Sequence, residues 1–229
     1  MRARLIEYRE IGPEVRHFVF DVPELERLDF TPGQFVSFTE TVLSREVTRA
    51  YSICSAPQGN RFELCLNRVK EGLLSPWLFE MQPGDTTHMT GPLGFFVPRQ
   101  PFSDAVLIAT GTGIAPFRAF LRWPPVVASG RRITLLFGAR YSYGLAFHAE
   151  FETLVRRRPG FRFLPTVTRP DAAYHGLTGW VSHHLDNALE NRLDVDVYVC
   201  GLRAMVDDVR ALLKARGFAR SQIHYERYD

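Results

Sequence analysis

The sequence predicts two domains in series, a strand-built domain at residues 1–99 and an α/β domain with a parallel sheet at residues 100–229. Three observations support this division. The first part of the chain consists of short β-rich runs separated by turn signals. From Ala105 the pattern changes, and short apolar runs alternate with helical segments. The stretch from Pro98 to Pro101 lies between the two patterns and is typical of a connection.

In the first domain, the strand candidates carry alternating or β-branched and aromatic residues. They are Arg2–Glu10, Val15–Val22, Gln34–Thr39, Thr48–Cys54, Arg61–Val69 and Asp85–Thr90. One helix, Leu73–Met81, interrupts them, with Gly72 before it and Pro76 in its first turn. Short strands at this spacing predict a closed barrel or a sandwich. Phe95 and Phe96 are expected in its core.

In the second domain, strand and helix candidates alternate along the chain. The strands are predicted at Ala105–Ala109, Ile133–Gly138, Phe161–Thr166 and Val195–Cys200. The helices are predicted at Ile114–Trp123, Leu145–Arg157, Val181–Glu190 and Arg203–Arg216. This alternation predicts a parallel sheet with helices on both faces, in which ligands bind beyond the carboxyl ends of the strands. A barrel followed by a nucleotide-type fold is the resulting picture.

A glycine pair follows the first strand of the second domain. Gly111 and Gly113 permit backbone angles and close approaches that a Cβ would forbid. Pro116 then marks the first turn of a helix, where a missing N–H costs nothing. The N–H groups of such a turn and the positive end of the helix dipole suit a pyrophosphate or another polar group. From the pattern alone, a tight connection that binds no ligand is an equal alternative.

The bulk composition is that of an ordinary folded protein. Charged residues make up 23% of the chain, hydrophobic residues make up 45%, and the net charge is only +3, which gives no reason to expect nucleic acid. The three cysteines are widely spaced, which argues against a disulfide framework, a zinc site or an iron–sulfur site. No apolar run reaches transmembrane length, and the first residues lack a secretory signal. We therefore expect a cytoplasmic protein with reduced thiols, no metal and no membrane partner, and we favour a monomer.

A second chemical cluster lies in the first domain. Arg49-Ala50-Tyr51-Ser52 ends a strand, so the Arg49 guanidinium and the Tyr51 ring should point to the same side. A guanidinium suits a phosphate, and a tyrosine ring suits a flat heterocycle. An ordinary edge pattern is the plainer alternative. Ser75, near the start of the predicted helix, suits either a phosphate or a helix cap.

Five motifs occur in one order along nearly the whole chain. They are Arg-x-Tyr-Ser at 49–52, Gly-x-x-Ser at 72–75, Gly-Thr-Gly-Ile-Ala-Pro at 111–116, Cys-Gly-Leu-Arg-Ala-Met at 200–205 and the ending Tyr-Glu-Arg-Tyr-Asp. Together they resemble the ferredoxin-NADP(+) reductase superfamily. The resemblance implies an antiparallel FAD-binding barrel followed by an NAD(P)-binding α/β domain, with FAD reduced by a nicotinamide cofactor.

The resemblance also implies roles for single residues. In the first domain, Arg49 would hold the FAD pyrophosphate, Tyr51 would lie against the flavin, and Ser52 would lie near flavin N5. The start of the helix would bind the pyrophosphate through Gly72, Leu74 and Ser75. In the second domain, the residues expected to bind the nicotinamide nucleotide are Gly111, Thr112, Gly113 and Gly201. Near the hydride-transfer position, the residues implied are Cys200, Glu226 as a charge and proton-handling group, and Tyr228 as the aromatic residue on or near the flavin.

The choice of nicotinamide and electron acceptor also follows from the resemblance. Arg140, Thr168 and Arg169 resemble positions that bind a 2'-phosphate, which favours NADP(H) over NAD(H). Plant-type members have a tyrosine near the adenine where this chain has Phe147, and bacterial members often have an arginine where it has Trp180.

The expected partner is a small one-electron carrier, ferredoxin or flavodoxin, because the chain has no Cys-x4-Cys-x2-Cys set for a [2Fe-2S] cluster. Arg68, Lys70 and Arg99 are candidates for a basic rim facing an acidic carrier. The alternatives are an NADH-dependent reductase serving an oxygenase or another acceptor, to which Gly-Trp-Val-Ser-His-His-Leu is also similar, and a non-catalytic nucleotide-binding regulatory subunit.

Overall fold

The computed structural model describes residues 1–228, and the contacts between residues divide them into two compact units. The first unit contains Met1–Pro98 together with Ala115–Trp123, and the second contains Arg99–Ile114 and the chain from Pro124 onward. Helix α2 (Ala115–Arg122) therefore groups with the first unit, although it follows the first strand of the second. The domain boundary at residue 99 stays a prediction.

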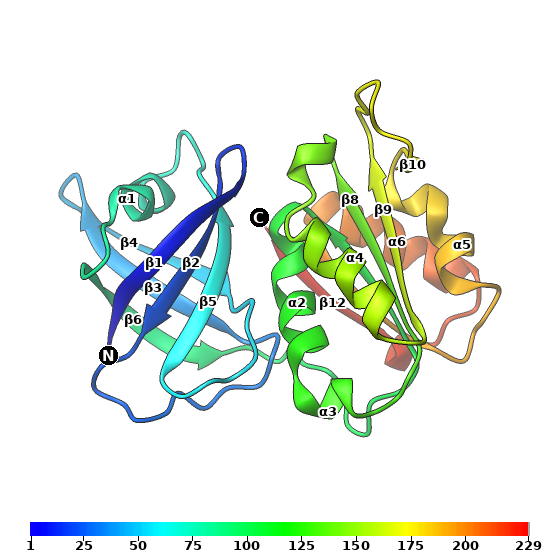
Figure 1. Ribbon diagram of the computed structural model, residues 1–229, viewed down its shortest axis with the longest axis horizontal. Helices are drawn as coiled ribbons and strands as arrows, with labels where there is room; N and C mark the ends of the chain where they lie inside the picture. The colour runs from blue at the N-terminus through cyan, green and yellow to red at the C-terminus, as the bar shows by residue number, and fades with distance from the viewer. Residues whose placement is uncertain (229) are drawn as a thin grey trace. The chain divides into compact units, whose positions relative to one another are not determined.

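The first unit is built on a six-stranded antiparallel sheet in the order β4-β3-β6-β1-β2-β5 (Figure 1). Its elements are β1 (Arg2–Gly12), β2 (Val15–Asp21), β3 (Phe35–Val42), β4 (Arg45–Ser52), β5 (Arg61–Asn67), α1 (Leu74–Glu80) and β6 (Thr86–Leu93). The two outer strands meet through an antiparallel bridge between Ile53 and Leu64, which joins the ends of the sheet. The prediction of an antiparallel barrel is confirmed.

Aromatic rings fill the interior of the barrel. Phe20 stacks on Phe62 with ring centroids 5.5 Å apart and meets the edge of Phe38 at 5.2 Å. All three rings are buried, as alternate residues on a strand with one face inward should be. The expectation for Phe95 was wrong, because this side chain is 99% exposed. Only Phe96 turns inward and packs against rings of α2, because successive residues of an extended chain face opposite ways.

The second unit is a six-stranded parallel sheet in the order β10-β9-β8-β7-β11-β12. Its strands are β7 (Ala105–Thr110), β8 (Ile133–Ala139), β9 (Phe161–Val167), β10 (Leu177–Thr178), β11 (Asp196–Leu202) and β12 (Ile223–Tyr228). Its helices are α3 (Pro124–Val127), α4 (His148–Arg157), α5 (Leu185–Leu189) and α6 (Arg203–Ala215). Helix α4 lies on one face of the sheet, and α5 and α6 lie on the other (Figure 1). The predicted α/β class is confirmed.

Three local features differ from the sequence prediction. The two edge strands, β10 and β12, were not predicted. The segment predicted as one helix from Val181 divides into a 3-10 turn at Val181–His184 and the short helix α5. Helix α4 begins at His148 rather than at Leu145, because Phe147 before it has a left-handed backbone with φ of 60°.

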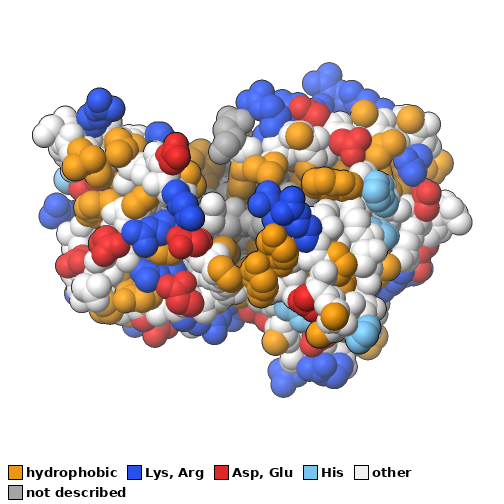
Figure 2. All heavy atoms as spheres, turned by 90° about the horizontal axis from the view of Figure 1, so that it is seen from above, with side chains coloured by type: hydrophobic (Ala, Val, Ile, Leu, Met, Phe, Trp, Pro, Cys, Tyr) orange, Lys and Arg blue, Asp and Glu red, His pale blue; other side chains and the backbone are white. Residues whose placement is uncertain are grey.

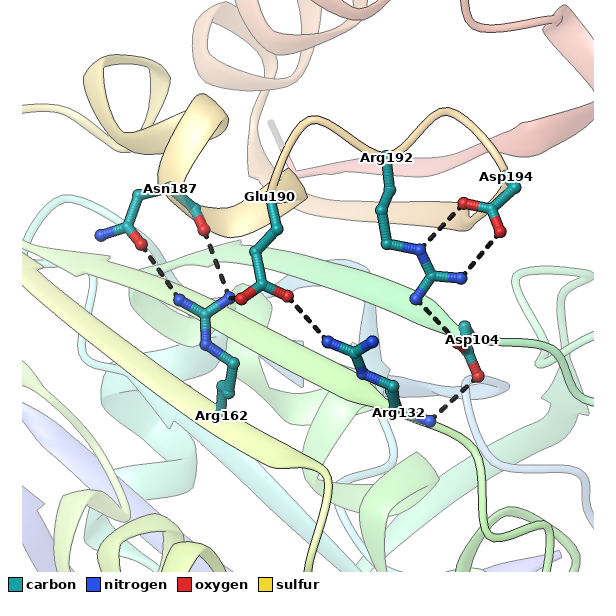
Figure 3. A network of polar contacts seen from close by, with 7 residues as sticks. All are labelled: Asp104, Arg132, Arg162, Asn187, Glu190, Arg192 and Asp194. Atoms are coloured by element: carbon teal, nitrogen blue, oxygen red, sulfur yellow. Dashed lines mark hydrogen bonds and ion pairs between the residues drawn. The ribbon is translucent and has the colours of Figure 1, made fainter.

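A network of ion pairs joins the amino-terminal ends of the second sheet (Figure 3). The Arg192 guanidinium lies 2.7 Å from Asp104 just before β7, and Glu190 accepts from Arg132 before β8 and from Arg162 in β9. These charges lie at the amino-terminal ends of the strands, whereas ligands are expected at the carboxyl ends. Figure 2 shows both positive and negative side chains on the face that it presents. No helix in residues 1–228 has the length and apolar character needed to cross a membrane.

Candidate functional site

In the first unit, the end of β4 carries the residues predicted to meet a flavin. The Tyr51 ring is half-buried and packs against Phe38, with centroids 5.8 Å apart. Burial raises the pKa of the Tyr51 hydroxyl, and the Arg49 charge opposes that rise. Arg49 is exposed, and its Nη1 donates to the carbonyl of Thr48 at 2.8 Å. Ser52 is buried at the last position of the strand.

The start of α1 is the second predicted contact. The Ser75 hydroxyl is buried and accepts from the Val69 N–H at 3.0 Å. It is therefore not a helix cap: the N-cap position is Leu73, which makes no side-chain capping bond. Leu74 is 1% exposed and packs in the barrel core, so its side chain is not open to a ligand. The roles proposed for Gly72, Leu74 and Ser75 at a pyrophosphate stay predictions.

A buried polar cluster that the sequence analysis missed contacts the chain just after β4, at Cys54. Arg118 of α2 donates from Nη1 to Glu63 Oε2 at 2.5 Å, and His17 Nε2 lies 2.8 Å from the same oxygen. His17, Cys54 and Glu63 have the spacing of a metal site, but the Arg118 guanidinium already lies against two of them and supplies the positive charge. An arginine between Phe117 and Ala119 in an apolar helix was the available signal.

In the second unit, the glycine turn after β7 approaches the end of β11 very closely. A Cβ on Gly113 would lie 2.4 Å from the carbonyl oxygen of Cys200, and a Cβ on Gly201 would lie 2.4 Å from Thr110 Oγ1. Gly111 has φ of 55°, while a Cβ there would meet open space. Thr110 Oγ1 is buried and has no hydrogen-bond partner among residues 1–228. The missing side chains at Gly113 and Gly201 let the turn and the end of β11 pack against each other. The open space at Gly111, next in the chain to the unsatisfied Thr110 hydroxyl, fits a polar ligand group.

The three residues predicted near a nicotinamide ring come together at the carboxyl ends of β11 and β12. Cys200 pairs with Glu226 across the two strands, and Leu202 pairs with Tyr228. Burial raises the pKa of the Cys200 thiol well above its usual value and the Glu226 charge adds to this, whereas a hydrogen bond with Tyr228 works in the other direction. The thiol therefore stays neutral at physiological pH. The catalytic roles of these residues stay predictions.

Two cations lie side by side at the ends of β8 and β9. The Arg169 N–H donates to the Arg140 carbonyl at 2.8 Å, and the Thr168 N–H donates to the Ala139 carbonyl at 3.1 Å, so the two strand extensions run together. Both arginine side chains are exposed. Arg169 Nη1 lies 3.4 Å from the hydroxyl of Tyr141.

An aromatic pair next to these cations was also missed by the sequence analysis. The rings of Tyr141 and Tyr143 stack with centroids 5.0 Å apart and an angle of 20° between their planes, and Tyr143 is 56% exposed. The signal was Tyr-Ser-Tyr directly after a predicted strand. Phe147, at the position of the plant-type tyrosine, is buried. Its ring is therefore not an open surface for a base.

Comparison with known proteins identifies the chain's family. Residues 2–97 match the family described as the oxidoreductase FAD-binding domain, and residues 107–211 match the oxidoreductase NAD-binding domain. Ferredoxin--NADP reductase B of Sorangium cellulosum is 35% identical over 237 residues, which cover 99% of this chain and 97% of that protein. The chain belongs to the ferredoxin reductase-type flavoproteins. The cofactors of this chain are FAD and a nicotinamide dinucleotide, NAD(P)H, and the chain transfers electrons between the two.

Other relatives of this reductase include components of oxygenase systems. The toluate 1,2-dioxygenase electron transfer component of Pseudomonas putida is 31% identical over 99% of this chain, which spans only 67% of that protein. Among solved structures, a ferredoxin NADP+ reductase from Neisseria gonorrhoeae with bound FAD and NADP has a TM-score of 0.85 at 27% identity, covering 99% of this chain and 98% of that one. An Amycolatopsis cytochrome P450 reductase, GcoB, has a TM-score of 0.88 at 28% identity, and the match covers 99% of this chain and 69% of that one.

Proposed function

We propose that this reductase takes a hydride from NADPH and delivers electrons one at a time to a ferredoxin or a flavodoxin. The observation that supports NADPH is the pair of exposed cations, Arg140 and Arg169, at the carboxyl ends of β8 and β9. NADPH differs from NADH by a 2'-phosphate, and a guanidinium can bind a phosphate through two parallel charged hydrogen bonds. The Sorangium relative named ferredoxin--NADP reductase supports the same cofactor and carrier.

The first unit offers residues to hold FAD, which when bound accepts a hydride at N5 and passes electrons on singly. Arg49 has an exposed guanidinium for a pyrophosphate, and Tyr51 offers a ring held firmly by its packing on Phe38. Ser52 supplies a hydroxyl for a hydrogen bond near N5. The main chain of Gly72 and Leu74 and the Ser75 hydroxyl complete the pyrophosphate contacts.

The second unit offers residues to hold the dinucleotide. In the turn formed by Gly111, Thr112 and Gly113, the open space at Gly111 lets a ligand approach the backbone, while Gly113 and Gly201 let the turn pack against the end of β11. Cys200 presents a neutral thiol beside the nicotinamide ring, and Glu226, its partner across the sheet, is placed to handle charge or a proton. Thr168 and the two arginines bind the 2'-phosphate.

The test is anaerobic reduction of the bound flavin, followed by its absorbance, with NADPH and NADH for the wild type and Arg169→Ala. We expect faster reduction by NADPH in the wild type and roughly tenfold weaker NADPH binding in the variant, with NADH unaffected, because a charged hydrogen bond is worth about 1.5–3 kcal/mol. Arg157→Ala, which removes an exposed arginine from α4, is the matched control. Equal rates with both nicotinamides and no effect of Arg169→Ala would reject NADPH.

The second candidate is an NADH-dependent reductase that serves an oxygenase. The toluate dioxygenase component supports it, as does the glycine betaine monooxygenase reductase subunit of Chromohalobacter salexigens, 28% identical over 94% of this chain. Trp180, which stands where bacterial members often carry an arginine, is 64% exposed and offers no charge to a phosphate. Preferential reduction by NADH would favour this candidate. No flavin reduction by either nicotinamide would instead favour a regulatory subunit without turnover.

The basic rim proposed for the carrier is weaker than the sequence implied. Arg68 forms an ion pair with Glu80 at 3.3 Å, and Arg99 donates to the Ser221 carbonyl at 3.2 Å, so both cations already have partners. Lys70 is exposed. Steady-state rates with ferredoxin and with flavodoxin at rising salt test the rim, because electrostatic steering weakens as ionic strength rises. Lys70→Ala should lower the rate at low salt only.

A further inference from the structure

Arg118 lies in an environment that ordinarily excludes charge. It is 3% exposed, and its neighbours on helix α2, Phe117 and Phe120, are fully buried. A buried guanidinium is costly unless hydrogen bonds and an opposite charge satisfy it, so such a residue calls for a specific explanation. A helix that needed only to pack would be served by an apolar residue of similar volume.

The contacts of Arg118 converge on one carboxylate and one carbonyl. Its Nη1 donates to Glu63 Oε2 at 2.5 Å and to the Cys54 carbonyl at 2.9 Å. His17 Nδ1 accepts from Arg9 Nε at 3.2 Å, which leaves the ring proton on Nε2 to be donated to the same Glu63 oxygen at 2.8 Å. The Glu63 carboxylate is therefore held from two sides, by a strand of the barrel and by α2.

Glu63 also holds the chain that leaves β4. Its carbonyl accepts from the Cys54 N–H at 2.8 Å, and its own N–H donates to Ser55 Oγ at 3.1 Å. Both polar groups of Cys54 are therefore bound, the N–H by Glu63 and the carbonyl by Arg118. Cys54 is two residues after Ser52, so the clamp fixes the backbone at the point where β4 ends.

We propose that Arg118 is a positioning residue for Ser52: with Glu63 it clamps the main chain at Cys54, so that the Ser52 hydroxyl has one fixed placement for hydride transfer. The proposal rests on the role proposed above for Ser52. Arg118 gives up neither a proton nor an electron in this role, and the hydride that the dinucleotide loses is the one that the flavin gains. Because the clamp lies in the barrel, its loss should affect the rate of transfer rather than the affinity for the dinucleotide.

The experiment compares Arg118→Met, which keeps the bulk and removes the charge, with Arg118→Lys and Arg122→Met. Arg122 is one turn further along α2 and reaches the same Glu63 oxygen only at 3.7 Å, and it is exposed where Arg118 is buried, so it is the matched control. Hydrogen exchange of residues 52–55 is measured by mass spectrometry in the flavin-free and the flavin-bound full chain. Stopped-flow reduction gives the limiting rate and the dissociation constant of NADPH.

For Arg118→Met we expect exchange at residues 52–55 at least about tenfold faster with or without flavin, a limiting rate at least about tenfold lower and a dissociation constant within about twofold of wild type. Arg118→Lys should recover part of the rate, and Arg122→Met should match the wild type. Wild-type exchange in Arg118→Met, or an equal effect of Arg122→Met, would overturn the proposal. If Arg118→Met does not fold, Glu63→Gln decides by the same two measurements.

The two hypotheses fail in different ways. A wild-type protein whose flavin is reduced by neither nicotinamide contradicts the proposed function, while the exchange measurement in the flavin-free chain still reports on the clamp. Normal flavin reduction in the wild type together with unchanged hydrogen exchange in Arg118→Met contradicts the clamp alone.

Discussion

The candidate binding residues of the two units differ in how they are held. In the barrel, the two serines predicted to meet a flavin are buried, although Arg49 is exposed: Ser75 accepts from the Val69 N–H, and Ser52 ends a strand just before Cys54, whose carbonyl accepts from Arg118. In the second unit the glycine turn packs closely on the end of β11 because Gly113 and Gly201 lack side chains, and the cations Arg140 and Arg169 are exposed.

This difference is what we expect if the first unit holds a cofactor that stays bound and the second unit binds a cofactor that exchanges. Buried groups with fixed partners hold one geometry and lose little entropy when a ligand arrives. Exposed arginines stay hydrated until a phosphate comes, and they release it again at modest cost. We therefore expect substitutions in the barrel to change the rate of chemistry and the stability of the fold, and substitutions of the exposed cations to change affinity.

The largest effect is expected at Gly113, where the close packing of the glycine turn on β11 depends on a missing Cβ. In Gly113→Ala the new carbon would lie 2.4 Å from the Cys200 carbonyl oxygen and 2.8 Å from Gly201 Cα, and both are backbone atoms that move only with their strand. We expect a loss of at least about 2 kcal/mol in the free energy of unfolding, measured by urea denaturation, and a loss of nicotinamide binding.

Gly144→Ala is the matched control for this substitution. Its Cβ would lie 3.5 Å from Ala139 Cβ, an ordinary contact, so the free energy of unfolding should change by no more than about 0.5 kcal/mol. Equal stability of the two variants would mean that the close approach of the turn after β7 to the end of β11 does not hold in solution.

The second effect tests whether the Glu63 carboxylate is held in the barrel by His17 and Arg118. Burial alone would raise the pKa of the Glu63 carboxyl, but hydrogen bonds from His17 and Arg118 outweigh it and lower the pKa to about 2. A carboxyl whose pKa is lower when folded than when unfolded stabilises the fold above the unfolded value. This stabilisation is lost as the pH falls from about 4.5 towards 2.

The measurement is the free energy of unfolding between pH 7 and pH 3 for the wild type and Glu63→Gln. One pKa unit corresponds to about 1.4 kcal/mol, so by pH 3 the wild type should lose roughly 2 kcal/mol that the variant, which cannot titrate there, does not lose. Parallel curves for the two proteins would show that the carboxylate is not held as the structure shows.

How well the sequence predicted each part depends on whether the signal is local. The apolar run Ala105–Ala109 is enough to predict a strand, and the glycines that follow it are enough to predict a turn. Strand β12 was missed because Ile-His-Tyr-Glu-Arg-Tyr mixes charged and aromatic residues, and its burial is one-sided at the edge of the sheet. Phe147 could not have been placed, since its left-handed backbone reflects tertiary packing rather than propensity.

For the site, ordered motifs placed Cys200, Glu226 and Tyr228 near one another although they lie in separate segments, and the strand pairing brings them together. The clamp through His17, Glu63 and Arg118 could not be predicted in the same way. Its members come from β2, β5 and α2, and nothing local in the sequence indicates that a histidine and an arginine will meet at one carboxylate oxygen.

The third effect concerns the ring at the end of β12. If Tyr228 occupies the position that the nicotinamide must take, Tyr228→Ser should tighten nicotinamide binding by roughly fivefold and relax the preference for NADPH over NADH, because a competing stack of about 1 kcal/mol is removed. Dissociation constants for both oxidised nicotinamides measure it. Tyr225→Ser on the same strand, where Tyr225 packs under Arg210 at 3.7 Å, is the control. Unchanged affinities in Tyr228→Ser would place this ring elsewhere.

The smallest effect separates two aromatic candidates for the adenine end of the dinucleotide. Tyr143 is exposed and stacks on Tyr141 beside Arg169, so Tyr143→Ala should raise the KM for NADPH about threefold with kcat unchanged, a cost of roughly 0.6 kcal/mol for one lost exposed stack. Tyr143→Phe keeps the ring and should behave as wild type.

Phe147→Tyr would restore the plant-type residue, but the side chain at this position is buried behind a left-handed turn, so its new hydroxyl should leave the KM unchanged. If Phe147→Tyr instead lowers the KM while Tyr143→Ala has no effect, the adenine lies over α4, and the exposed surface beside Arg169 recognises the phosphate alone.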